Sequence, residues 1–171
     1  QFIQAEPASR VGLIQALAVG ERFMVYWDLV DTIWKKVSIH HGGEVFLRQY
    51  NASPEASRIL LAAHWTQSEV RNGGFGQYFS NSTGVLAPEA VAAFRVIGMP
   101  KIAAIVEQAM AFFGSPYPRE AEDREEVLEA SWEASDDDDP FSEINDSFFE
   151  LINTENGGFV AAADKYATAN G

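Results

Sequence analysis

Carboxylates in the last third of the chain have a spacing that could carry chemistry. Four of them fall at positions i, i+4, i+7 and i+11 of one expected helix, with a fifth at the edge: Glu122, Glu126, Glu129, Glu133 and Glu125. Such positions share one helical stripe, here about 16 Å long. Neighbouring carboxylates on the stripe lie about 5–6 Å apart. The chemistry that this arrangement offers is an ordered display of negative charge.

A second acidic stripe follows on the next expected helix. Glu143, Asp146 and Glu150 fall at i, i+3 and i+7, and Asp136 to Asp139 join the two helices. Like charges at i,i+4 disfavour a helix by about 0.2–0.5 kcal/mol per pair, and we see no benefit to folding that would offset this cost. The sequence therefore predicts a partner-binding set made of Glu122, Glu125, Glu126, Glu129, Glu133, Asp136, Asp137, Asp138, Asp139, Glu143, Asp146 and Glu150.

The net charge of −13 comes entirely from this part of the chain. Residues 1–118 hold nine acidic and nine basic residues, whereas residues 119–171 hold 16 acidic and three basic residues. Direct binding to nucleic acid or to an anionic membrane needs a basic surface and is therefore disfavoured. A cationic partner is favoured instead.

The acidic stripes allow two interpretations. Duplex DNA presents dense negative charge along its backbone, so an ordered acidic ridge can occupy the Arg and Lys side chains with which a DNA-binding protein contacts phosphates. A solvated acidic face that keeps the protein soluble would have the same composition.

An enzymatic interpretation would use polar residues of a pocket within residues 64–81: His64, Glu69, Asn72 and Gln77. His64 and Ser68 are i,i+4 neighbours, so a His–Ser pair is geometrically possible, but no nucleophile-elbow pattern accompanies it. A histidine that caps a partly buried polar cluster is the simpler reading. We therefore expect a protein that is not an enzyme.

No metal or cofactor is expected. The chain has no cysteine, which excludes thiolate sites and disulfides and fits a reducing cytoplasm. His40 and His41 are adjacent, which rarely lets both bind one ion. The run Asp136 to Asp139 lacks the glycine and the bidentate glutamate of a calcium loop.

The periodicity of apolar residues predicts an all-α fold, a single compact domain over residues 1–171 with about seven to nine short helices. The expected helices cover 7–20, 22–39, 44–50, 54–69, 87–98, 100–113, 120–134, 140–153 and 158–169. Ser53 is expected to cap the fourth of these, with Pro54 as its first residue. Ala121, Leu128 and Trp132 should face the core from the first acidic helix. Phe141, Ile144, Phe148 and Leu151 should do so from the second.

A tight corner is expected after residue 69. Asn72-Gly73-Gly74 is a helix-stop signal, because Asn and Gly tolerate the left-handed conformation. Aromatic residues then resume at helical spacing and should face inward, while the amides of Asn72, Gln77 and Asn81 tie the backbone together. The structural motif comprises Glu69, Asn72, Gly73, Gly74, Phe75, Gln77, Tyr78, Phe79 and Asn81. Asn-Gly-Gly-Phe recurs at 156–159, which we interpret as two similar helix ends.

This stretch also carries a resemblance. Glu69-Val70-x-Asn72-Gly73-Gly74-Phe75-x-Gln77-Tyr78-Phe79-x-Asn81 resembles the signature of a bacterial all-helical family best known for an acidic DNA-mimic protein. The segments 90–98 and 101–103 are similar to that family's next block, and the resemblance covers roughly residues 55–130. It implies an all-helical dimer that competes with DNA for a DNA-binding regulator, although most members have no assigned activity.

These observations lead to one expected function and two alternatives. We expect a cytoplasmic, acidic protein that binds a basic DNA-binding protein, such as a transcription factor, and blocks its access to DNA. It would not bind nucleic acid or an anionic membrane directly, because both need a basic surface. No membrane span is expected either, since no apolar run approaches the roughly 20 residues that a span requires. An immunity-type inhibitor of a basic nuclease would look the same in sequence. A ligand-binding or enzymatic domain centred on residues 64–81 is the other alternative.

Overall fold

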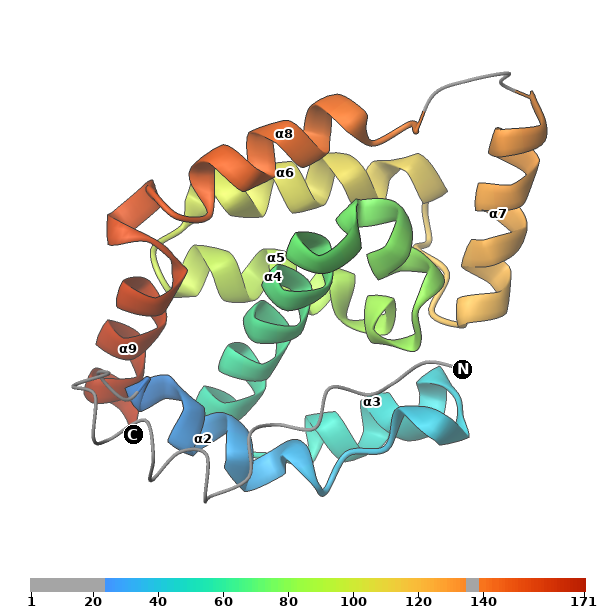
Figure 1. Ribbon diagram of the computed structural model, residues 1–171. Coiled ribbons are helices and arrows are strands. Elements are labelled where there is room, and N and C mark those ends of the chain that lie inside the picture. The colour runs from blue at the N-terminus through green and yellow to red at the C-terminus, as the bar shows by residue number, and fades with distance from the viewer. Residues whose placement is uncertain (1–23, 135–138) are drawn as a thin grey trace.

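The long helix α4 (Glu55–Ser80) runs through the middle of the molecule, and the other helices pack around it (Figure 1). The computed structural model describes residues 24–134 and 139–171. These residues form eight α-helices and no strand, which confirms the predicted all-α single domain. The expected helix 7–20 lies outside the described residues. The remaining α-helices are α2 (Val25–Trp34), α3 (Gly43–Asn51), α5 (Ala87–Val96), α6 (Pro100–Met110), α7 (Ala121–Ala134), α8 (Ser142–Leu151) and α9 (Phe159–Asn170).

Contacts between the helices show how the acidic third is attached to the rest of the molecule. Helices α5 and α6 pack against each other, and α8 lies along α6. Helix α2 contacts both α4 and α9, whereas α7 stands at one end of the molecule against α4 and the short 3-10 helix η3 (Ser82–Leu86) (Figure 1). Three further 3-10 turns are η2 (Ile39–His41), η4 (Ala111–Phe113) and η5 (Glu155–Gly157).

The first described helix is shorter than the sequence predicts. Helix α2 ends at Trp34, and Ser38 has an extended backbone that ends the helical run. The backbone N–H of Ser38 donates to the side chain of Gln49 in α3, at 2.8 Å. His40 and His41, expected in a loop, form part of η2. The segment after the helix is thus bonded to a residue eleven positions further along the chain, a contact that helical periodicity does not predict.

The expected cap of α4 is wrong by one residue. Pro54 is the residue before the helix and has an extended backbone, with φ −56° and ψ 141°, and α4 begins at Glu55. The Ser53 hydroxyl donates to the carbonyl oxygen of Gln49 at 3.1 Å, so it completes the end of α3 and does not cap α4. Serine side chains often donate to a carbonyl four residues earlier, as Ser53 does here.

An aromatic cluster joins the second half of α4 to α8. The rings of Phe75 and Phe148 have their centroids 5.4 Å apart with nearly perpendicular planes, and those of Phe79 and Phe141 lie 5.5 Å apart. All four side chains are buried, with 1% or less of their surface exposed. Edge-on and tilted ring pairs of this kind add to the free energy of burial. The second acidic helix is thus held to the core by its predicted apolar face.

Candidate functional site

The Asn-Gly-Gly corner is a sharp break within α4. Gly74 has φ +74° and ψ −179°, and a new helical turn begins at Phe75. The break frees the backbone N–H of Phe75, which donates to Oδ1 of Asn145 at 2.9 Å. A Cβ atom on Gly74 would lie only 2.8 Å from Nδ2 of the same Asn145. The corner therefore requires a glycine for two reasons, the positive φ and the close approach of α8.

The amides that were expected to tie this corner together do something else. The side chains of Gln77 and Asn81 donate to the Glu69 carboxylate, at 3.4 Å and 2.8 Å, and Asn72 is exposed. The amide that holds the corner backbone is Asn145, which was not among the residues predicted for this motif. Its only sequence signal is a polar residue among the inward-facing aromatic residues of α8.

Asn145 also connects the corner to the start of α8. Its Nδ2 donates to Oδ2 of Asp139 at 3.0 Å, and Oδ1 of Asp139 accepts from the backbone N–H of Phe141 at 3.0 Å. Asp139 was expected to be a free charge for a partner. Both of its oxygens instead accept hydrogen bonds that fix the entry into α8, so its role is at least partly structural.

Helix α7 is anchored by a buried arginine that was not among the predicted site residues. Arg124 is 0% exposed although four acidic residues surround it in sequence. Its guanidinium donates to five carbonyl oxygens at 2.7–3.1 Å, those of Phe79, Asn81, Pro118, Arg119 and Glu120. The carbonyls of residues 79 and 81 lie at the end of α4, where they have no partner within the helix. Arg124 thus satisfies this end and joins α7 to it.

The packing of α7 differs from the prediction at one residue. Leu128 is fully buried as expected and Ala121 is half-buried, but Trp132 is 48% exposed. Arg124 occupies the buried seam together with Leu128, and the contact with the core ends one turn before Trp132. The prediction failed because helical spacing cannot tell where the neighbouring helix stops.

The carboxylates of both predicted stripes are exposed wherever the structure describes them. These residues are Glu122, Glu125, Glu126 and Glu129 on α7, and Glu143, Asp146 and Glu150 on α8. Asp123 is exposed as well and was missed because it lies off the stripe. Glu133 belongs to α7, but its side chain is not described, and Asp136 to Asp138 lie outside the described residues.

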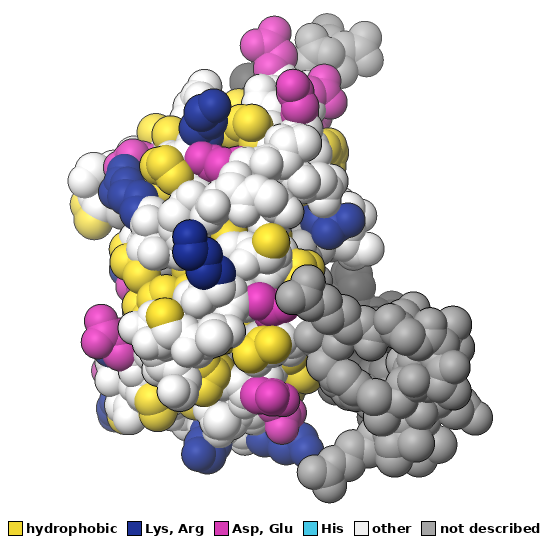
Figure 2. All heavy atoms as spheres, turned by 90° about the vertical axis from the view of Figure 1, so that its left-hand side faces the viewer, with side chains coloured by type: hydrophobic (Ala, Val, Ile, Leu, Met, Phe, Trp, Pro, Cys, Tyr) yellow, Lys and Arg dark blue, Asp and Glu magenta, His cyan; other side chains and the backbone are white. Residues whose placement is uncertain are grey.

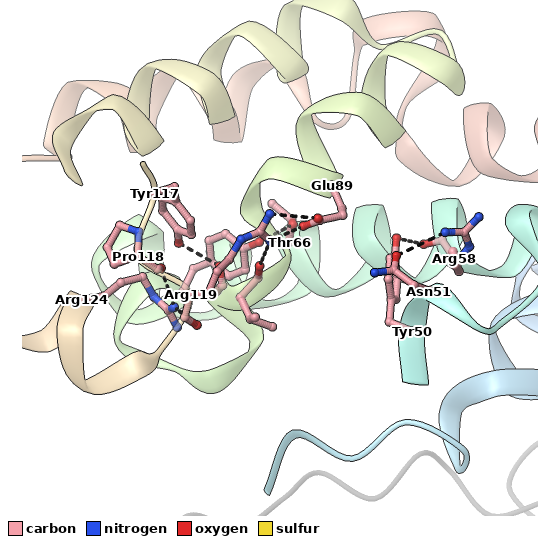
Figure 3. A network of polar contacts seen from close by, with 12 residues as sticks. Tyr50, Asn51, Arg58, Thr66, Glu89, Tyr117, Pro118, Arg119 and Arg124 are labelled. Atoms are coloured by element: carbon pink, nitrogen blue, oxygen red, sulfur yellow. Dashed lines mark hydrogen bonds and ion pairs between the residues drawn. The ribbon is translucent and has the colours of Figure 1, made fainter. Parts of the chain in front are cut away.

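No exposed basic side chain interrupts these charges on the described parts of α7 and α8. Arg119, just before α7, pairs with Glu89 of α5 at 2.7 Å (Figure 3), and Arg124 is buried. Lys165, the third basic residue after residue 118, lies in α9. By contrast, basic, acidic and apolar side chains are mixed on the face at the α9 end of the molecule (Figure 2).

Three other acidic residues of the last third stabilise the starts of distant helices. Both oxygens of Glu120 accept from the first N–H of α3, at 2.9 and 3.1 Å. Glu155 accepts from the N–H groups of residues 101 and 102 in α6, both at 2.9 Å, and Asp164 accepts from Tyr26 N–H in α2 at 2.9 Å. A carboxylate at a helix start is favourable because it meets unpaired N–H groups and the positive end of the helix dipole. Part of the acidity therefore does benefit folding, but it is not the part on the outer stripes.

The alternative site around His64 does not form as expected. His64 is mostly buried among Tyr26, Trp27 and Trp34, whose ring centroids lie 5.8, 4.9 and 6.0 Å from its own. A hydrogen bond of 3.0 Å joins its Nδ1 to the Tyr26 hydroxyl. Burial lowers the pKa of His64 from 6.5 to about 4, so the ring is neutral at pH 7. In the described part of the chain no hydrogen bond joins it to Ser68, which is exposed.

Two shallow hollows lie elsewhere on the surface. One, of about 310 Å³, is lined by Ile39, His40, Gly42, Ser82 and residues 120–122. The other, of about 250 Å³, lies between the end of α5 and α9. Neither is lined by His64. Within residues 24–134 and 139–171, no three His, Asp or Glu side chains gather as a metal site would require. No described helix is both long and apolar enough to cross a membrane.

Fold and surface together define a small all-helical domain whose last third displays unpaired carboxylates. The chain belongs to the DMP19-like protein family, which matches residues 51–170. This match includes α4 with its corner and both acidic helices, so it extends beyond the segment of roughly 55–130 that the motif covers. No curated protein and no solved structure matched the chain.

Proposed function

We propose that this protein binds a basic DNA-binding protein, such as a transcription regulator, and occupies the side chains with which that protein contacts DNA. The observation that carries the proposal is the exposure of seven predicted carboxylates on α7 and α8, with no exposed basic side chain among them in the described residues. The ion pairs of the described residues, Arg95–Glu107 and Arg119–Glu89, use none of these carboxylates. The charges are therefore free to meet a partner.

The density of charge on α7 supports a likeness to DNA. Four exposed carboxylates of the predicted set lie between positions 122 and 129, namely Glu122, Glu125, Glu126 and Glu129. Seven residues of helix rise about 10 Å, which gives one negative charge per about 2.6 Å. A single strand of duplex DNA carries one per about 3.4 Å of the helix axis. A cationic surface that contacts one DNA strand would therefore meet a comparable charge per unit length on this helix.

The anchoring of the two helices adds to the proposal. Arg124 fixes α7 to the end of α4, and Asn145 with the aromatic cluster fixes α8 to the corner. Charges on fixed helices lose little conformational freedom on binding, which favours affinity. Membership of the DMP19-like family is consistent with this function. The proposal assigns no catalysis to the protein.

The test is a pull-down from host lysate at low salt, with elution by a salt gradient. We expect one DNA-binding protein, released at moderate salt and displaced by duplex DNA that contains its own binding site. A mixture of unrelated basic proteins would mean that the acidic third is only a solvated surface. A captured nuclease would instead identify an immunity-type inhibitor.

A matched pair of variants assigns the interaction to α7. The triple variant Glu122→Gln, Glu126→Gln, Glu129→Gln removes three stripe charges. Its control removes three exposed charges from the neutral part of the chain: Asp28→Asn, Asp31→Asn and Glu44→Gln. The two variants have the same net charge, so only the stripe variant should elute at lower salt. Equal shifts of both variants would contradict a role of the stripe.

A further inference from the structure

Trp132 is the one tryptophan of the chain whose side chain is largely exposed. The ring of Trp65 is buried, and those of Trp27 and Trp34 are half-buried against the core. Trp132 is 48% exposed, and it is not among the side chains that pack against the core of the described residues. An indole has a large apolar surface whose exposure to water is unfavourable, and no packing against the described core offsets this exposure.

The position of Trp132 on α7 places it beside the acidic stripe. Glu129 precedes it by three residues, which puts the two side chains on adjacent turns with Cβ atoms about 5–6 Å apart. The carboxylate of Glu129 is exposed and forms no ion pair with a described residue. An aromatic face and a free carboxylate therefore lie next to each other at the surface.

We propose that Trp132 and Glu129 together form a docking site for an arginine side chain of the basic partner. This inference rests on the proposed function and specifies the chemistry of its partner. The guanidinium plane would stack on the indole while its N–H groups donate to the carboxylate. The site is complementary in charge, and the exposed ring supplies the apolar face that a planar cation needs.

Arginine fits this pair better than lysine does. Its planar guanidinium is weakly hydrated, stacks on aromatic rings and donates in a fork that matches a carboxylate. The lysine ammonium is a compact, strongly hydrated charge that gains little from the ring. The stripe alone attracts both residues by charge, whereas the ring next to it discriminates between them.

The experiment uses two labelled helical peptides of equal length and charge, one with arginine and one with lysine at every fourth position. Their affinities for the full chain are measured by fluorescence anisotropy at low and at moderate salt. We expect the arginine peptide to bind about two- to five-fold more tightly to the unmodified protein. In Trp132→Ala the preference for the arginine peptide over the lysine peptide should be lost, because only carboxylates remain to bind either peptide. In Trp132→Phe, which keeps an aromatic ring, most of this preference should remain. Val127→Ala, which shortens another exposed apolar residue of α7, should leave it unchanged.

Two failures would be distinguishable. If Trp132→Ala keeps the same arginine preference while Glu129→Gln weakens both peptides, the docking site is wrong but the acidic surface remains a binding surface. If neither peptide binds in a salt-dependent way, and the stripe variant with Glu122, Glu126 and Glu129 neutralised behaves as the unmodified protein, the proposed function fails together with this inference.

Discussion

Two interfaces of α4 enclose a basic side chain. The interface with α2 contains His64, which is neutral at pH 7, and the interface with α7 contains Arg124, which is charged. His64, between α2 and α4, is surrounded by aromatic rings and has one hydroxyl partner, and burial lowers its pKa to about 4. Arg124, between α4 and α7, is buried completely but reaches five carbonyl oxygens. An arginine keeps its charge in proteins, so this interface contains a cation.

The comparison shows that acceptors, more than burial, decide whether a charge can be kept inside this protein. Rings offer His64 no strong acceptor, so its charged form is disfavoured. Carbonyls at the end of α4 have unused lone pairs and a negative dipole, and both favour a cation. The α2–α4 interface therefore favours a neutral histidine, whereas the α4–α7 interface accommodates a charged arginine.

Removing the cation should have the largest effect. Arg124→Met removes the guanidinium that donates to five buried or partly buried carbonyls, of which those of residues 81 and 120 keep a backbone donor, so we expect a loss of about 3–5 kcal/mol in the free energy of unfolding. Urea denaturation followed by circular dichroism measures it. The control Arg95→Met removes an arginine whose ion pair with Glu107 is exposed, and should cost less than about 0.5 kcal/mol. Equal losses would show that α7 does not depend on the buried guanidinium.

Acid should weaken the interface that contains His64. The folded-state pKa of about 4 lies below the unfolded value of 6.5, so the unfolded chain binds the proton first as the pH falls. The contribution of neutral His64 is complete above pH 6.5 and is lost between pH 6.5 and 4, by about 3 kcal/mol in total.

The measurement compares this protein with His64→Gln, which cannot titrate but can still accept from the Tyr26 hydroxyl. As the pH is lowered from 7.5 to 4, the unfolding free energy of the unmodified protein should fall by more than that of His64→Gln. A difference that stays constant over this range would mean that the ring is hydrated in the folded state.

The interface of α4 with α8 can be tested with two glycines that lie two residues apart. Gly74→Ala forces a side chain into a positive φ and to within 2.8 Å of Asn145, so we expect a loss of about 1–3 kcal/mol. Gly76 is helical and no atom lies within 4 Å of a Cβ added to it, so Gly76→Ala should stabilise by about 0.5–1 kcal/mol. Thermal unfolding of both variants checks the opposite signs. The same sign in both would contradict the described corner.

The smallest effect should separate the inward carboxylates from the outward ones. Glu155→Gln weakens two hydrogen bonds at the start of α6, and we expect a loss of about 0.5–1 kcal/mol. Glu150→Gln changes an exposed carboxylate of the α8 stripe and should leave stability nearly unchanged or slightly raised, because it relieves repulsion. The two variants have equal net charge, so a comparison of their melting temperatures isolates the position. A larger loss of stability in Glu150→Gln than in Glu155→Gln would contradict the structural role assigned to Glu155.

Local signals in the sequence predicted much of this fold. Pro88 and Pro100 mark the starts of α5 and α6, and the Asn-Gly-Gly break interrupts α4 where expected. Helical periodicity also predicted that the carboxylates of α7 and α8 face outward, because the apolar residues of these helices left them no other side. Their role in binding stays a prediction.

The interactions that hold the acidic helices depend on partners far away in the chain and could not be predicted. Arg124 looks like one more charge in an acidic stretch until the end of α4 is placed beside it. Glu155 caps a helix that begins more than 50 residues earlier. Trp132 was assigned to the core from its spacing alone, since no local pattern shows where a neighbouring helix ends.

The hydrogen bond between Asn145 and the backbone of Phe75 makes the buried Phe75 amide sensitive to the position of Asp139 at the start of α8. The Phe75 amide proton is buried and donates to a side chain whose other end binds Asp139 at the start of α8. We therefore expect a shift of Asp139 to change the chemical shift and the hydrogen-exchange rate of the Phe75 amide as well as those of the Phe141 amide, which donates to Asp139 directly. In an NMR spectrum, the resonance of the Phe75 amide would therefore indicate whether a partner has displaced Asp139.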